Sequence, residues 1–214
     1  KQTNHILNDI KKLKERDKKL SGSASISVTG LAYKDEKNYL DNGLNILKNL
    51  IKHSLNKQGF PKSINIQNLA FYLKYFIIIR EWFKESQNPI PEYVDETIYY
   101  LGSSYAFIWQ NIKQDIFFNG NYSSNHNEFD QYLKRFGYTF KNQINELAGY
   151  TILQNKKFIL AADIGSNPDK IYPKNYQAGS LAVEIFSNDK KLMSNAGYYP
   201  DTKNILNKFS KSTA

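Results

Sequence analysis

The hydrophobic periodicity of this 214-residue chain changes once, near residue 112. Upstream, apolar residues recur every three or four positions, as at Leu40, Leu44, Leu47 and Ile51, which places them on one face of an α-helix. Downstream, short apolar runs alternate with turns that contain Asn, Asp or Gly, as expected for β-strands. A run of helices followed by a run of strands predicts an α+β protein.

Several helices are expected before residue 112. The segment 69–83 is apolar nearly all round, which predicts a helix buried between others. A break at Pro89-Ile90-Pro91 precedes a long helix, which is predicted by a stripe of Val94, Ile98, Leu101, Tyr105, Ile108 and Ile112. In residues 23–29 apolar residues alternate with serines as in a strand, but the helices on both sides favour a helix.

After residue 115 the pattern predicts a short helix at 127–136 and two β-hairpins. Tyr150–Leu153 and Phe158–Asp163 flank the first turn, and Leu181–Phe186 and Lys191–Ser194 flank the second. Asn and Asp in these turns tolerate the positive φ that tight hairpins need. The run 116–118 is also β-like. In 181–186, Val183 shares a face with two aliphatic residues and Glu184 lies on the other face, which predicts a half-buried strand whose Glu184 pairs with a lysine across the sheet.

Composition excludes several classes of protein. The chain has no cysteine, so disulfides, thiolate catalysis and Cys-ligated zinc are excluded. No uncharged apolar stretch reaches the roughly 18 residues that a membrane span needs. The net charge is +9, but only three of the 29 basic residues are arginines, which favours a solvated lysine surface over a nucleic-acid interface. Attraction to an acidic polymer is a third interpretation that the charge alone does not rank.

The ends of the chain predict a piece of a longer protein. The chain begins at Lys1 in an amphipathic pattern, without a methionine or a signal peptide, and four strands with open edges rarely stand alone. We therefore expect the sheet to continue beyond Ala214.

An ordered series of short motifs resembles the heparinase II/III-like polysaccharide lyases, in particular an uncharacterised bacterial branch. The series is Gln58-Gly59-Phe60-Pro61-Lys62-Ser63, Phe118-Asn119-Gly120, Ala148-Gly149-Tyr150, Ala161-Ala162-Asp163-Ile164-Gly165, Tyr176-Gln177-Ala178-Gly179-Ser180-Leu181, Ser194-Asn195-Ala196-Gly197 and Lys211-Ser212-Thr213-Ala214. The resemblance implies an incomplete α/α toroid over 1–114, a connecting segment over 115–147, and the first strands of an antiparallel β-sandwich over 148–214.

The resemblance also implies cleavage of acidic, uronate-containing glycans by β-elimination. That chemistry needs a donor that neutralises the uronate carboxylate, a base for the C5 proton and an acid for the leaving oxygen. The implied proton-transfer residue is Tyr176 or Tyr72, and Asn119 and Gln177 are the implied donors on the carboxylate side. Lys62 and Arg80 would bind sugar acids, although solvation is the favoured explanation of Lys62, and an ion pair with Glu81 or Glu85 is that of Arg80.

Departures from the family pattern leave a second function open. Asn68 occupies the place of a family tyrosine, and Gln177 and Asn195 occupy the places of a metal-binding histidine and aspartate, so neither a metal nor another cofactor is expected. The alternative is a non-catalytic member of the fold that binds a glycan or the cell envelope. Neither enzyme nor binding module is excluded, and the fragment by itself is expected to be inactive. A lyase would act in the periplasm or the envelope, while a cytoplasmic location is also open.

Overall fold

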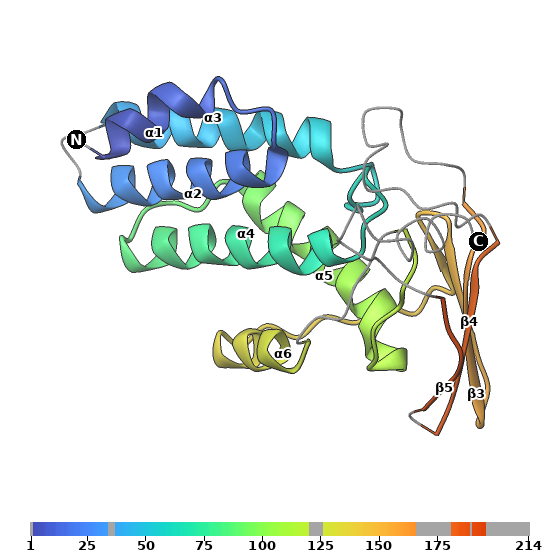
Figure 1. Cartoon of the computed structure of the whole chain (residues 1–214). Helices are drawn as coiled ribbons and strands as arrows, with labels where there is room; N and C mark the ends of the chain where they lie inside the picture. The colour runs from blue at the N-terminus through green and yellow to red at the C-terminus, as the bar shows by residue number, and fades with distance from the viewer. Residues whose placement is uncertain (1, 34–36, 120–125, 166–180, 189, 196–214) are drawn as a thin grey trace. The chain divides into compact units, whose positions relative to one another are not determined.

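The computed structural model describes residues 2–33, 37–119, 126–165, 181–188 and 190–195 (Figure 1). Six helices precede a sheet of five strands within these residues. They are α1 (Gln2–Ile10), α2 (Arg16–Ala32), α3 (Lys37–Ser54), α4 (Gln67–Glu85), α5 (Glu92–Ile112), α6 (His126–Arg135), β1 (Glu146–Leu147), β2 (Tyr150–Gln154), β3 (Phe158–Asp163), β4 (Val183–Ser187) and β5 (Lys190–Met193). The predicted α+β class, with helices first and an antiparallel sheet after them, is confirmed.

The chain divides into two compact units. Unit 1 contains residues 1–59 and 71–101, and unit 2 contains residues 60–70 and 102–214. Unit 1 therefore holds α1 to α3 and most of α4, whereas unit 2 holds α6, the sheet and the turn that leads into α4. The division into 1–114, 115–147 and 148–214 stays a prediction.

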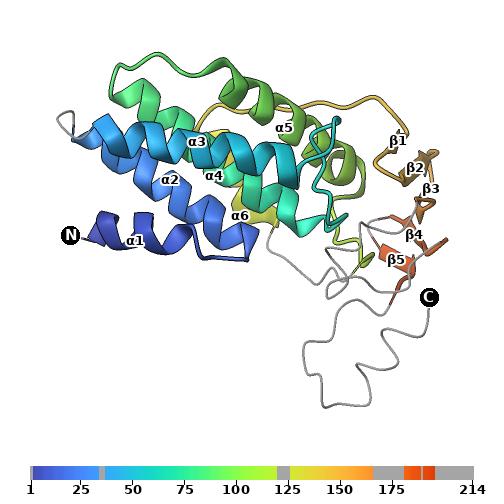
Figure 2. The same cartoon turned by 90° about the horizontal axis from the view of Figure 1, so that it is seen from above.

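In unit 1, α1 packs on α2 and α2 packs on α3 (Figures 1 and 2). The serine-rich segment of α2 is helical, as predicted. The hydroxyl of the buried Ser27 donates a 2.9 Å hydrogen bond to the Ser23 carbonyl, so its polar group is satisfied inside the helix. A Cβ at Gly43 would lie 2.3 Å from the Ser27 hydroxyl oxygen. The small residues thus let α2 and α3 approach closely.

The two long helices follow their predicted patterns. In α4, Leu69, Leu73 and Ile77 are fully buried, as the all-round apolar pattern predicts. In α5, the whole predicted stripe is at most 5% exposed, from Val94 to Ile112. None of the helices in the described ranges is both long and apolar enough to cross a lipid bilayer.

The sheet of unit 2 has the strand order β1-β2-β3-β4-β5, and neighbouring strands are antiparallel. Both predicted hairpins are confirmed, and the short β1 was not predicted. Tyr150 at the start of β2 pairs with Asp163 at the end of β3. Gly149 has a φ of +88°, and a Cβ there would lie 2.5 Å from the Gly165 Cα, so only glycine fits beside this strand end.

One detail of the sheet prediction is wrong, and another was left open by the sequence. The β-like run at 116–118 forms no strand, because the N–H of Phe117 is bound by the Glu184 carboxylate instead of a neighbouring strand. In β4 the face that is buried carries Glu184 and Phe186, which are 0% and 2% exposed, while Val183 and Ile185 are half-buried. The alternation of residues along the sequence separates the two faces of a strand but does not show which face is buried. A charged residue can lie on the buried face when its charge is paired.

Candidate active site

Tyr72, a predicted proton-transfer residue, lies on α4 in unit 1 and is 6% exposed. Burial raises the pKa of its hydroxyl well above the usual value, and the nearby Asp17 carboxylate of α2 raises it further. A phenol in this environment stays protonated at neutral pH. Tyr72 therefore does not serve as a base at neutral pH. Its remaining role is to donate a proton to a leaving oxygen, and the raised pKa makes it a weaker acid for that step.

Arg80 lies near the end of α4 and contacts two acidic side chains of the same unit. Its Nε is 2.5 Å from Asp95 Oδ1 on α5, and its Nη1 is 3.2 Å from Glu81 Oε1. An ion pair with Glu81 or Glu85 was the predicted structural role of Arg80. The pair with Glu81 is present, and the pair with Asp95 was not predicted. A sugar carboxylate at Arg80 would have to compete with both of these partners.

Lys62 is half-buried in the turn of unit 2 that leads into α4. Side chains on both sides of it stabilise this turn. The Asn68 amide donates a 3.1 Å hydrogen bond to the Ser63 hydroxyl, and the Asn65 carboxamide oxygen accepts a 2.9 Å hydrogen bond from the Gln67 N–H at the start of the helix. Asn68, at the place of the family tyrosine, thus has a structural contact.

Asn119 is 2% exposed and joins the first hairpin of the sheet to the segment after α5. Its Nδ2 donates to the Tyr150 hydroxyl at 2.6 Å and to Asp163 Oδ2 at 2.8 Å. Its φ of +48° is the left-handed conformation that an Asn-Gly turn favours. Both N–H bonds of the predicted donor are thus directed at the protein itself, and its Oδ1 is buried without a partner among the described residues.

Asp163 completes this polar cluster at the end of β3. Burial raises the pKa of its carboxyl, while hydrogen bonds from Asn119 and from the Gly165 N–H oppose that shift. The Tyr150 hydroxyl, which accepts from Asn119, donates a 2.6 Å hydrogen bond to the Ile64 carbonyl. The cluster of Asn119, Tyr150 and Asp163 therefore connects the sheet to the turn that carries Lys62, all within unit 2.

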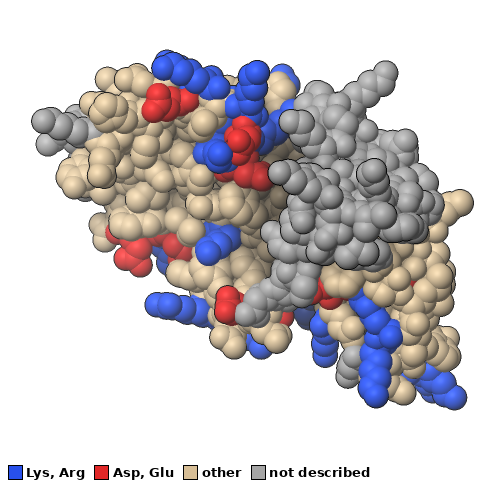
Figure 3. Space-filling view, in the orientation of Figure 1, with Lys and Arg blue, Asp and Glu red and all other residues tan. Residues whose placement is uncertain are grey.

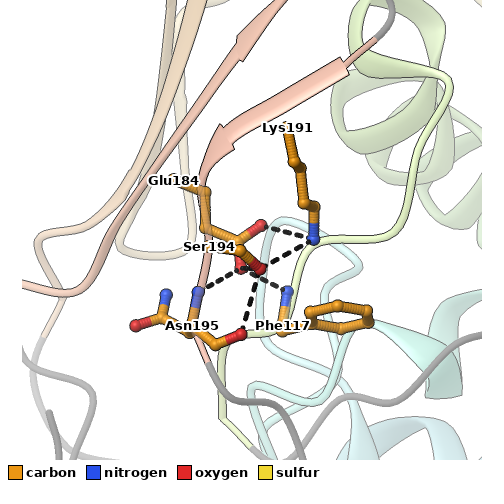
Figure 4. A network of polar contacts seen from close by, with 5 residues as sticks. All are labelled: Phe117, Glu184, Lys191, Ser194 and Asn195. Atoms are coloured by element: carbon orange, nitrogen blue, oxygen red, sulfur yellow. Dashed lines mark hydrogen bonds and ion pairs between the residues drawn. The ribbon is translucent and has the colours of Figure 1, made fainter.

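A second polar network surrounds Glu184, which is fully buried in β4 (Figure 4). Its Oε1 accepts hydrogen bonds of 3.1 Å from the backbone N–H groups of Phe117 and Asn195, and its Oε2 is 3.0 Å from Lys191 Nζ. The Lys191 ammonium also lies 3.6 Å from the centroid of the Phe117 ring. The predicted pair of Glu184 with a lysine is confirmed, and the network fixes the segment that precedes Asn119.

Tyr176 and Gln177 fall outside the described residues, so their predicted roles stay predictions. Among the residues that are described, no three or more His, Asp or Glu side chains come together as metal ligands would. In the view of Figure 3, basic side chains are spread over the described surface and acidic ones lie between them.

Sequence reasoning assigned no role to Tyr150 or Asp163. Both stand in the motif series that carries the family resemblance, at Ala148-Gly149-Tyr150 and at the end of 161–165. A signal was present, since a carboxylate that directly follows two buried alanines at a strand end requires a buried partner. The identity of that partner depends on tertiary structure.

Comparison with known proteins gives a family match for part of the chain and a fold match for nearly all of it. Residues 146–214 match the family model described as "Heparinase II/III-like, C-terminal". The chain is also similar to the solved structure titled heparinase III, with 15% identity, a TM-score of 0.71, and coverage of 91% of this chain and 37% of that one. The comparison with curated proteins gives no match.

Two further solved structures are similar. For the heparan sulfate lyase HepC from Pedobacter heparinus the identity is 14% and the TM-score 0.75, with coverage of 97% of this chain and 38% of that one. For the heparinase III-BT4657 gene product the identity is 13% and the TM-score 0.77, with coverage of 99% of this chain and 36% of that one. At these identities the likeness shows the fold, and this chain spans less than two-fifths of each structure. The family model confirms the resemblance to the heparinase II/III-like family over residues 146–214.

Proposed function

From this likeness to the heparinase II/III-like family, we propose that the protein carrying this chain is a polysaccharide lyase that cleaves uronate-containing glycans by β-elimination. The observation that carries the proposal is the family match over 146–214 in a chain whose helices and sheet follow the fold of solved heparinases over 91–99% of its length. One of those structures is titled a heparan sulfate lyase, which suggests a glycosaminoglycan as the first substrate class to test.

The described residues support particular roles in this reaction. Tyr72 would act as the general acid, because its phenol is protonated at neutral pH and its raised pKa rules out the role of base. Lys62 would bind a sugar carboxylate from the turn before α4. Asn119 would act by holding Asp163 and Tyr150 in place, since both of its N–H bonds are directed at them. Tyr176 and Gln177 would complete the proton-transfer and donor groups.

The alternative is a glycan-binding member of the fold that does not cleave. Two points favour it. The resemblance implies that Asn68 stands where lyase members carry a tyrosine, and its amide is bonded to Ser63; Arg80 is paired with Asp95 and Glu81. Such a protein would keep the cationic surface and lose the acid–base chemistry.

The experiment uses the full-length protein with a panel of uronate polymers, namely heparan sulfate, hyaluronan, chondroitin and alginate. The ultraviolet absorbance of the unsaturated uronate product should rise with at least one polymer. If none of the polymers gives this signal but one binds reversibly, the binding function is supported instead. If none is cleaved or bound, both proposals fail.

A further inference from the structure

A hollow of about 570 Å³ lies in unit 1 where α1, α2 and α3 meet. Lys11 and Lys14 from the α1–α2 connection, and Arg16 and Lys19 from the first turn of α2, line it together with Asn49 and His53 from the end of α3. We call it the basic hollow. Among the residues that the structure describes, no acidic side chain lines it, and its volume is within the range of sites for small ligands.

The acidic residues of this segment are engaged elsewhere. Glu15 pairs with Lys18 at 2.9 Å, and Asp9 lies 3.8 Å from Lys12. Asp17 lies near Tyr72, whose pKa it raises. Lys11, Lys14 and Lys19 consequently have no ion-pair partner among the described side chains, and all three line the same hollow.

The walls of the basic hollow are fixed and partly apolar. Arg16 Nη1 donates a 3.0 Å hydrogen bond to the His53 carbonyl, which holds its guanidinium against the end of α3. Ile10 and Leu50, which are 2% and 9% exposed, form an apolar floor. Acidic sugars combine apolar C–H faces with anionic substituents. In this hollow the apolar side chains can contact the C–H faces, and the lysines can bind the anionic substituents.

The basic hollow also adjoins the surroundings of a predicted catalytic residue. Arg16 lines it and also lines a smaller hollow that includes Tyr72 and Ser54. A ligand in the basic hollow would therefore lie in a part of unit 1 that neighbours the residue proposed to donate a proton.

We propose that the basic hollow is a subsite for an anionic stretch of an acidic oligosaccharide, whose carboxylate or sulfate groups bind Lys11, Lys14 and Lys19. This inference rests on the proposed function and adds where the polymer is held. A polysaccharide fits better than a nucleic acid, because three of the four cations are lysines, which bind anions as point charges and lack the arginine fork that reads phosphates and bases.

The test replaces the three lysines together, as Lys11→Ala, Lys14→Ala and Lys19→Ala, in the full-length protein. The matched control removes three exposed lysines of the sheet, as Lys156→Ala, Lys157→Ala and Lys190→Ala, and so changes the net charge equally. Calorimetry with a heparan sulfate decasaccharide should show binding weakened about tenfold or more in the first variant, since three ion pairs with anionic groups of the sugar are lost together. The control should stay within about threefold of the wild type.

Cleavage kinetics give a second measurement. Because the subsite would bind substrate and transition state alike, the triple variant should raise KM and leave kcat nearly unchanged. If the wild type binds or cleaves and both triple variants behave alike, the subsite is wrong and the lyase function is untouched. If the first variant no longer binds duplex DNA but still binds the decasaccharide as the wild type does, the hollow is a nucleic-acid surface and the proposal is overturned.

A wild type that neither binds nor cleaves any uronate polymer would overturn the subsite together with the function. Circular dichroism controls for folding. If the alanine variant unfolds, it is replaced by the corresponding Lys→Gln variant, which removes the same charges and retains polar side chains of similar length. The binding and kinetic results expected of the alanine variant are then expected of the Lys→Gln variant.

Discussion

The Tyr150 hydroxyl donates a 2.6 Å hydrogen bond to the backbone carbonyl of Ile64, 86 residues earlier in the chain. Ile64 has a φ of +54°, a conformation that β-branched residues adopt rarely. The hydrogen bond therefore helps to hold an unfavourable backbone geometry in the turn that carries Lys62.

Tyr150→Phe removes this donor and leaves the buried Asn119 amide with one acceptor fewer. We expect a loss of about 1–3 kcal/mol in the free energy of unfolding, because a buried polar group loses its partner. Hydrogen–deuterium exchange should show faster exchange in the peptide that covers residues 60–70.

The matched control is Tyr99→Phe. Tyr99 is 67% exposed and contacts the ring of Tyr100, a contact that phenylalanine keeps. If both variants lose the same stability, or if exchange over 60–70 is unchanged in Tyr150→Phe, the proposed role of the Tyr150 hydroxyl is contradicted.

The Glu184–Lys191 pair gives a second prediction. Lys191→Met should destabilise the protein by about 3–5 kcal/mol, since it leaves a carboxylate buried without its cation. The double variant Lys191→Met with Glu184→Gln should lose less than the sum of the single losses. Lys190→Met, at the exposed neighbouring position, should change stability by less than about 0.5 kcal/mol in the same urea titration. Additive losses would argue against coupling.

Asp163 predicts a pH dependence of stability. Its pKa is raised in the folded protein above 3.8, so between pH 3.8 and the folded pKa the native state holds a proton that the unfolded chain has lost. Stability should therefore fall as the pH rises through this window. Asp163→Asn keeps an acceptor for Asn119 and removes the titration.

The measurement is a series of urea midpoints between about pH 4 and pH 7. The urea midpoint of Asp163→Asn should change less with pH than that of the wild type. The control variant Glu146→Gln, at an exposed position, should give a curve parallel to that of the wild type. Parallel curves for all three proteins would show that Asp163 does not contribute.

Tyr72→Phe tests the acid of the proposed reaction. In the full-length enzyme it should lower kcat by roughly 10²–10⁴-fold, with a smaller effect on KM. Tyr75→Phe, one turn along the same helix at a position that is only half-buried, should leave kcat unchanged. Equal rates for Tyr72→Phe and the wild type would assign the proton transfer to another residue, with Tyr176 as the next candidate.

Local sequence patterns predicted most elements of this fold, because periodicity and turn residues act over a few positions. The α5 stripe and both hairpins are examples. The patterns failed where a distant group decides the outcome. Glu184 lies inward because Lys191 and two backbone N–H groups satisfy its carboxylate, and 116–118 forms no strand for the same reason. The Asn119 contacts likewise join residues 31 and 44 positions apart, so no local pattern could indicate them.

The central claim is that the protein breaks uronate glycans by elimination. The most direct measurement is mass spectrometry of the oligosaccharides released from a purified uronate polymer by the full-length protein. Elimination predicts products whose new non-reducing ends are one water lighter than those of hydrolysis, and carry a carbon–carbon double bond. Products with the mass of hydrolysis, or an intact polymer throughout the panel, would contradict the claim.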